Sequence, residues 1–194
     1  MLRAVAPYPS QPPVIIGCNI LLAYAYIVLP YLKNESLINF LLKAEAQNRV
    51  LSRGLRMHLY NQMLLAVHDL HSRSGIAHND LKPDNFVITD EGNLALIDFA
   101  HASAISQMLR VVTGTTAYTA PEVRMLVESG QTEYLNYSAQ QSDMWQLGVN
   151  LFIALSGKLP YGKLSDGFFD LIKARDIEGF FRAHNLSTIS PILK

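Results

Sequence analysis

Residues 78–100, HNDLKPDNFVITDEGNLALIDFA, restrict the possible folds of this chain more than any other stretch. Two short apolar runs, 86–88 and 94–97, lie on either side of TDEGN. Apolar runs that flank a turn of this composition predict a β-hairpin. Polar side chains precede the first predicted strand and follow the second. The fold must therefore place a hairpin beside a polar loop.

The polar residue types around this hairpin suit a site that handles a metal-bound phosphate. Asp80 can accept or orient the proton of an attacking hydroxyl group. Lys82 is a point charge suited to a phosphate in transfer. Asn85 and Asp98 offer oxygen atoms, and two such ligands together with substrate phosphates are typical of Mg²⁺. Phosphoryl transfer demands mainly positioning and charge neutralisation.

The apolar run Val14–Leu29 is predicted to form two strands. Its 16 residues are fewer than the roughly 20 that a membrane-spanning helix needs. Four prolines in residues 1–13 predict a loose leader, and they separate Arg3 from the apolar run, which argues against a signal peptide. Cys18 is the only cysteine. An internal disulfide is therefore impossible, and a reducing, cytoplasmic location is expected.

Helical periodicity is found in several other parts of the chain. Ser36 is placed to cap a helix that begins LINFLLKAEAQ. Residues 55–73 carry an apolar stripe that Gly75 would end, and residues 143–156 are apolar almost all round, as in a fully buried helix. Residues 166–184 look amphipathic. Residues 101–119 are predicted to be a polar loop.

Composition supports one globular domain. Of the 194 residues, 49% are hydrophobic, and 16 basic residues balance 16 acidic ones. Bulk charge therefore gives no reason to expect a nucleic-acid or membrane partner. His68, His71 and His78 can suggest a metal site, but this interpretation is not favoured, because zinc sites are uncommon in a chain with a single cysteine.

Four short motifs together resemble the protein kinase family. HNDLKPDN, residues 78–85, is similar to the catalytic loop, and IDFA, residues 97–100, is similar to its metal-binding Asp-Phe-Gly. TAPE, residues 119–122, and SDMWQLG, residues 142–148, follow in the family's order. Lys82, together with a Gly-Thr pair at 114–115, resembles the Ser/Thr-specific branch. The C-terminal part is loosely similar to calcium/calmodulin-type kinases.

The resemblance implies a role for each matching residue of the transfer site. Asp80 would be the catalytic base, and Lys82 would contact the transferred phosphate. Asn85 and Asp98 would hold Mg²⁺, with ATP as the phosphoryl donor. Thr115 would lie in the substrate pocket, near Asp80 and Lys82.

Other matching residues would support the site. Asp143 would brace the catalytic loop through its backbone amides. His78 would pack under Phe99. Glu122 matches the glutamate of Ala-Pro-Glu, and the arginine that pairs with it in the family would lie beyond Lys194.

The implied fold is α+β and protein-kinase-like. It comprises a mostly helical large lobe with short β-hairpins and a remnant of the small-lobe sheet. Residues 1–13 would be the leader, 14–32 the last small-lobe strands and hinge, and 33–194 a truncated large lobe. The adenine-binding residues implied by the resemblance are Leu29, Pro30, Leu32 and Val87.

Several features depart from the family pattern. No Gly-rich loop, no Val-Ala-x-Lys and no helix with a pairing glutamate precede residue 14. Asn79 replaces the arginine before the catalytic aspartate, so control by activation-loop phosphorylation is not expected. Ala100 replaces a glycine, which restricts a backbone pivot. Ser103 and Ser106 are candidate modification sites.

Three functional hypotheses follow. The first is a Ser/Thr protein kinase that transfers phosphate from Mg-ATP to protein Ser/Thr hydroxyls. The second is a pseudokinase or truncated isoform that binds a regulatory or scaffold protein; the missing lysine–glutamate clamp favours it for the isolated chain. The third is an incomplete product whose exposed apolar faces cause aggregation.

Overall fold

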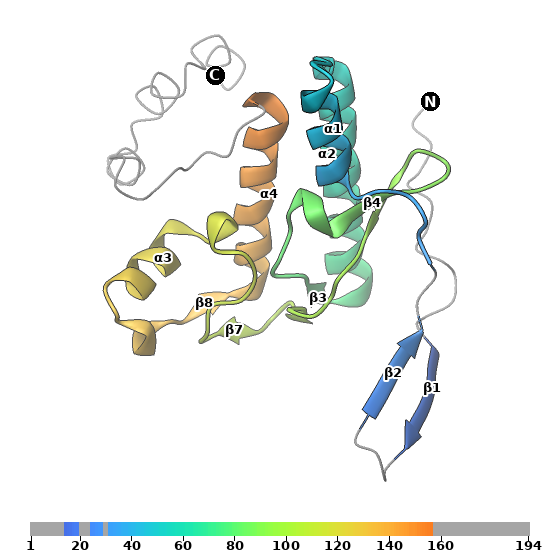
Figure 1. Ribbon diagram of the computed structural model, residues 1–194. Helices are drawn as coiled ribbons and strands as arrows, with labels where there is room; N and C mark the ends of the chain where they lie inside the picture. Colours follow the sequence, from blue (N-terminus) through green and yellow to red (C-terminus); the bar gives the residue numbers. More distant parts are fainter. Residues whose placement is uncertain (1–13, 20–23, 29–30, 157–194) are drawn as a thin grey trace.

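The computed structural model describes residues 14–19, 24–28 and 31–156. This part of the chain is α+β, with helices and short antiparallel strand pairs (Figure 1). Residues 1–13, 29–30 and 157–194 lie outside it, and so do the predicted leader, Leu29, Pro30 and the predicted amphipathic stretch 166–184. The α-helices are α1 Leu37–Ala46, α2 Arg53–Asp69, α3 Pro121–Glu128 and α4 Ala139–Ser156.

The strands form two-stranded antiparallel sheets. The first pair, β1 and β2, confirms the two strands predicted within the apolar run 14–29, with Cys18 opposite Ala25. No helix in the described ranges has the length and apolar character of a membrane span. The strands are β1 Val14–Asn19, β2 Tyr24–Val28, β3 Ile76–Ala77, β4 Phe86–Ile88, β5 Leu94–Leu96, β6 Ser103–Ala104, β7 Met108–Leu109 and β8 Tyr137–Ser138.

The predicted central hairpin is confirmed. Strand β4 pairs with β5, and Phe86 lies opposite Leu96. Gly92, with a φ of 77°, lies in the turn between them, a backbone conformation that glycine adopts readily. The hairpin therefore forms where a turn sequence separates the two apolar runs.

The segment 101–119, predicted as a loop, contains two short strands. Strand β6 pairs with β3, and β7 pairs with β8. The prediction was wrong there because ladders of two residues leave no recognisable periodicity in the sequence.

The second helix follows its predicted stripe except at the start. Leu59, Met63 and Val67 are buried, but Leu55 is 38% exposed. Helix α2 continues into a π-helical turn, Leu70–Ser74, and Gly75 ends it with a φ of 64°, as predicted.

Ser36 occupies the N-cap position of α1, but its side chain makes no capping hydrogen bond. The predicted cap is therefore correct in position and wrong in its interaction. Ser36 forms an isolated antiparallel bridge with Val87 of β4 instead. That bridge ties the start of α1 to the hairpin.

Helix α4 differs from the fully buried apolar helix that was predicted. It begins at Ala139, and Met144 on its surface is 55% exposed. Its buried face includes the polar side chains of Asp143, Gln146 and Asn150. The face opposite Met144 therefore has polar groups to satisfy inside the protein.

One hydrophobic core joins the helices to the hairpin. Helix α2 lies beside α4 and packs against β5 (Figure 1). Phe86 and Leu81 are completely buried within this core. The buried core residues are Leu37, Leu59, Tyr60, Met63, Val67, Leu81, Phe86, Leu94, Leu96 and Leu147. The polar loop before β4 is therefore anchored in the core at its middle, by Leu81, and where it enters β4, by Phe86.

We expect Phe86→Ala to destabilise the fold by about 3–5 kcal/mol, because it leaves a cavity at the centre of the core. Urea denaturation measures the free energy of unfolding. Leu42→Ala in α1 is the control, since Leu42 is 53% exposed and should change stability far less. Equal losses for the two variants would contradict the proposed position of the core.

Candidate active site

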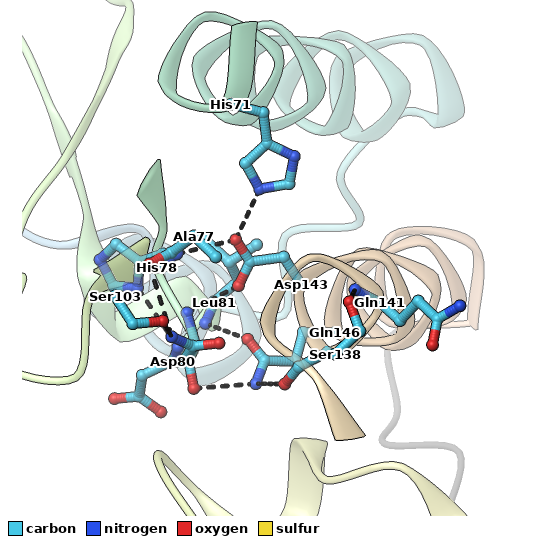
Figure 2. Close-up of polar contacts among 12 residues, drawn as sticks. His71, Ala77, His78, Asp80, Leu81, Ser103, Ser138, Gln141, Asp143 and Gln146 are labelled. Atoms are coloured by element: carbon cyan, nitrogen blue, oxygen red, sulfur yellow. Dashed lines mark hydrogen bonds and ion pairs between the residues drawn. The ribbon is translucent and has the colours of Figure 1, made fainter. Parts of the chain in front are cut away.

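The loop between β3 and β4, residues 78–85, is a buried and irregular segment. His78, Asn79 and Leu81 are fully buried, and Asp80 is 3% exposed. Backbone groups that are buried outside regular strands and helices need other hydrogen-bond partners. Side chains of α4 supply them (Figure 2).

Asp143 of α4 accepts hydrogen bonds from two consecutive backbone amides of this loop. Its Oδ1 accepts from Asn79 N at 2.6 Å and its Oδ2 from His78 N at 2.8 Å. Oδ2 also lies 2.7 Å from Nε2 of His71, which reaches across from the end of α2 (Figure 2). One buried carboxylate therefore links the end of α2, the loop and α4.

The Asp80 carboxylate gathers three of the other predicted site residues. Its Oδ1 accepts from Thr115 N at 2.8 Å, and its Oδ2 lies 2.9 Å from Lys82 Nζ. Asn85 Nδ2 donates to that same Oδ2 at 3.1 Å and to the Asp80 backbone oxygen at 2.8 Å. Lys82 also donates to Thr115 Oγ1 at 2.6 Å. The structure thus brings Asp80, Lys82, Asn85 and Thr115 together.

The environment of Asp80 keeps its carboxyl group ionised at neutral pH. Burial raises its pKa, but the hydrogen bonds from Lys82 and Thr115 and the charge of Lys82 outweigh burial, so the pKa lies below its ordinary value. A carboxylate that is ionised and partly buried can accept a proton from a nearby hydroxyl group.

His78 is neutral and joins two parts of the site. Burial lowers its pKa, against the opposing effects of the Ile97 carbonyl and nearby carboxylates, including Asp98. Its Nε2 lies 2.9 Å from Ile97 O, and its Nδ1 accepts from Asp80 N at 3.3 Å. These partners assign the proton to Nε2. The ring also packs edge-on against Phe99, with centroids 5.0 Å apart.

Asp98 follows β5 with an exposed side chain and a φ of 61°. A non-glycine residue in this region is uncommon, and such backbone strain clusters at functional sites. Ile97 N donates to Asn85 O at 2.9 Å, so the hairpin brings the backbones at Asn85 and Asp98 close together. Because the Asn85 amide nitrogen is bonded to Asp80, its Oδ1 is the atom available to a cation.

A metal at this position would need ligands besides protein carboxylates. Among the described residues, no group of three or more His, Cys, Asp or Glu side chains is arranged to hold a metal ion. The oxygens of Asn85 and Asp98 are nevertheless hard donors of the kind that Mg²⁺ takes. This donor set suits a cation that is shared with a phosphate ligand and water.

The predicted nucleotide-binding residues are described only in part. Val87 is buried in β4, and Leu32 is half-buried in the linker before α1. The linker is attached to the hairpin by a hydrogen bond from Ile88 N to Glu35 O at 3.1 Å. An exposed ion pair of 3.1 Å joins Lys33 to Asp90. The linker therefore runs beside the strand that carries Val87.

Asn79 anchors the segment that follows Asp98. Its Nδ2 donates to His101 O at 3.0 Å and to Ser103 Oγ at 2.9 Å. Its Oδ1 is buried without a hydrogen-bond partner, and its φ is 64°. The neutral side chain that replaces the expected arginine is thus committed to internal contacts.

One predicted residue, Glu122, lies at the edge of this arrangement. Glu122 is exposed in the first turn of α3, where the helix dipole favours an acidic group. Thr119 behind it is buried, and its hydroxyl donates to Thr115 O at 3.4 Å. The contact attaches the start of α3 to the segment that carries Thr115.

Sequence reasoning assigned no role to Gln146 and Asn150, although both bond the loop backbone. Their signal was present in the sequence. Asp143, Gln146 and Asn150 are three polar residues spaced three and four apart in residues 143–155, which are otherwise apolar. That spacing places them on one face.

Comparison with known proteins matches residues 16–191 to the protein kinase domain family. The chain is 36% identical over 141 residues to the ovarian-specific serine/threonine-protein kinase Lok of Drosophila melanogaster, covering 70% of this chain. It is 34% identical over 145 residues, 72% of the chain, to CBL-interacting serine/threonine-protein kinase 12 of Arabidopsis thaliana. Each match spans 27% of the relative's length. The predicted family is confirmed.

Gly114 packs directly against the loop, and this contact can be tested. A Cβ added there would overlap Asn79 O and lie 2.9 Å from Asp80 Oδ1. We expect Gly114→Ala to destabilise the fold by about 1–2 kcal/mol through its positive φ. The overlap should add about 1–3 kcal/mol.

Gly92→Ala is the matched control, because Gly92 has a φ of 77° but no atom within 4 Å of the added Cβ. Urea denaturation of both variants separates backbone strain from the clash. Equal losses would mean that residue 114 does not press on the loop.

Asp80 should also make stability depend on pH. Because its folded pKa is lowered, it contributes stability that is fully present above the unfolded value of about 3.9. This contribution is lost as pH falls through the folded pKa. We therefore expect the difference in unfolding free energy between wild type and Asp80→Asn to shrink below about pH 4.

Denaturation at pH 7, 5 and 3.5 measures this trend. Asp90→Asn is the comparison: the Asp90 pKa is also lowered, by Asn34 and Lys33, but its side chain is exposed and should contribute less. A constant difference for Asp80→Asn across the three pH values would be evidence against the ionised, hydrogen-bonded carboxylate.

Proposed function

The chain belongs to the protein kinase domain family, and we propose that it carries the phosphoryl-transfer residues of a Ser/Thr protein kinase that uses Mg-ATP. The observation that carries the proposal is the buried Asp80 carboxylate. Thr115, Lys82 and Asn85 hold it in one orientation. Phosphoryl transfer depends mostly on positioning of this kind.

In the proposed reaction, Asp80 takes the proton of a substrate Ser or Thr hydroxyl. The hydroxyl oxygen forms a bond to the γ-phosphorus of ATP, and the bond from that phosphorus to the β–γ bridging oxygen breaks. ADP leaves with that oxygen. The lowered pKa keeps Asp80 ionised, so the carboxylate is able to accept a proton at neutral pH.

Lys82 would act through the positive charge of its ammonium group. Its ammonium group lies 2.9 Å from Asp80 Oδ2 and 2.6 Å from Thr115 Oγ1. A positive charge fixed beside the proton acceptor would stabilise the negative charge of the phosphoryl group in transfer. Its two hydrogen-bond partners hold a flexible side chain in place.

Asn85 and Asp98 would hold Mg²⁺, which neutralises phosphate charge when bound. Asn85 is oriented by its two hydrogen bonds to Asp80. Asp98 has an exposed side chain, and its Oδ1 accepts from Ala100 N at 3.3 Å. Together they would supply an amide oxygen just before β4 and a carboxyl oxygen just after β5.

The adenine of ATP would lie against Val87 and the linker at Leu32. Leu29 and Pro30 belong to the same proposal but lie outside the described residues. Val87 is 7% exposed. Its surroundings include the Ser36 bridge, so the linker and the strand would move together as one wall of the site.

The substrate would be a protein hydroxyl near Thr115. Regulation by a phosphorylated activation segment is not expected, because Asn79 is neutral and already bonded to His101 and Ser103. Control by a regulatory or scaffold protein fits this arrangement better.

We expect Asp80→Asn to lower phosphoryl transfer to a generic basic protein by about 10²- to 10⁴-fold, because the proton acceptor is lost. Mg-ATP should still raise the melting temperature of this variant, since a ligand that binds only the folded state stabilises it. Asp98→Asn should lose most of that increase.

Transfer by Asp80→Asn at the wild-type rate would rule out Asp80 as the base. A cooperative melt without any Mg-ATP shift in the wild type would reject the nucleotide site and favour a protein-binding module. Glu91→Gln, an exposed change in the hairpin turn, is the control for a general effect of charge.

A further inference from the structure

Helix α4 presents a row of three buried polar side chains to the loop. Asp143, Gln146 and Asn150 are at most 2% exposed. Asp143 bonds the amides of His78 and Asn79, as described above. The two residues that follow it bond the next part of the same loop, on either side of Asp80.

The Gln146 amide bonds the two peptide groups that flank Asp80. Its Nε2 donates to Asn79 O at 3.0 Å, and its Oε1 accepts from Leu81 N at 2.6 Å (Figure 2). Asn79 O belongs to the peptide group before Asp80, and Leu81 N belongs to the one after it. A primary amide suits this position because it carries a donor and an acceptor on one planar group.

Asn150 adds one more hydrogen bond to the loop and one within α4. Its Nδ2 donates to Leu81 O at 3.0 Å and to Gln146 O at 2.8 Å. The backbone at Leu81 is therefore held at both its N–H and its C=O. A loop with this many satisfied bonds has little freedom to shift relative to α4.

The backbone before Asp80 needs such support. Asn79 has a φ of 64°, a conformation that costs energy for a residue other than glycine and persists only where its surroundings hold it. Gln146 bonds the carbonyl of this strained residue directly. Loosening that bond would let the backbone relax and carry the Asp80 side chain with it.

We propose that Gln146 is a positioning residue for Asp80: its amide clamps the peptide groups before and after Asp80 and so sets the direction of the carboxylate. The inference rests on the proposed function for its effect on the reaction rate. The hydrogen bonds of Gln146 to the peptide groups on either side of Asp80 can be tested without any reaction.

A second explanation has to be separated from this one. A buried amide with satisfied hydrogen bonds also stabilises a fold, and its removal costs stability wherever it lies. Only a positioning residue changes the surroundings of the Asp80 carboxylate while the rest of the fold stays intact. The readouts must therefore report on Asp80 and Leu81 individually.

Gln146→Met removes donor and acceptor at nearly constant length. Gln146→Asn is the milder variant; it keeps an amide that is too short to reach both peptide groups. Gln141→Met is the matched control, because Gln141 is exposed on the same helix and points away from the loop (Figure 2). All variants are made in the 194-residue chain and compared well below their melting temperatures.

Three measurements test whether Gln146 positions Asp80. Amide exchange of Leu81, observed by NMR, should be at least about tenfold faster in Gln146→Met than in Gln141→Met. The pKa of the Asp80 carboxyl, followed by carbon NMR, should rise toward its ordinary value as the bonds from Lys82 and Thr115 weaken. The kcat should fall by about 10- to 100-fold with KM unchanged.

Wild-type exchange of Leu81 and a wild-type Asp80 pKa in a folded Gln146→Met variant would overturn the inference. The same results in Gln146→Asn would do so if the Met variant does not fold. If the wild-type chain transfers no phosphoryl group, the proposed function fails by itself. Exchange and titration still decide in that case whether Gln146 holds Asp80.

Discussion

The pairing of the Asp143 carboxylate with the backbone at residues 78–79 is the interaction on which the rest of the site depends. The loop is buried and irregular, so its amides cannot be satisfied by neighbouring strands or by water. A charge at the centre of a protein is itself costly unless it is fully bonded. Here the buried amides of His78 and Asn79 bond the buried Asp143 carboxylate, and His71 is its third partner. The loop can therefore lie inside the protein, between α4 and the hairpin, without leaving the amides of His78 and Asn79 unpaired.

The polar network and the apolar core share residues. Leu81 fills the core while its backbone is bonded by Gln146 and Asn150. Gln62 does the same for the hairpin, because this buried amide accepts from Leu94 N. Leu81 and Leu94 therefore each contribute an apolar side chain to the core and a hydrogen-bonded backbone group to the polar network. Such a site loses its geometry when either the packing or the hydrogen bonding is disturbed.

The sequence predicted those elements whose signal is local. The hairpin around Gly92, the strand pair in 14–29 and the helix that ends at Gly75 each follow from periodicity and turn chemistry. The family motifs led to the members of the polar cluster. What could not be predicted depends on partners distant in the chain. Gln146 bonds a backbone 65 residues away, and β6 exists only because β3 lies beside it. The spacing of Gln146 from Asp143 and Asn150 predicts a polar helix face but not the segment that it contacts, and β6 leaves no pattern in its own segment.

The neutral ring of His78 has a mechanical consequence. One of its nitrogens bonds the amide of Asp80, and the other bonds the carbonyl of Ile97, which immediately precedes Asp98. An imidazole ring is rigid, so it acts as a spacer of constant width between the backbones of two acidic residues that come from different strands' ends. A shift of either backbone would therefore displace the other or break one of these hydrogen bonds. The separation between these two acidic positions is therefore governed by the dimensions of one aromatic ring and not by the flexibility of the loops that carry them.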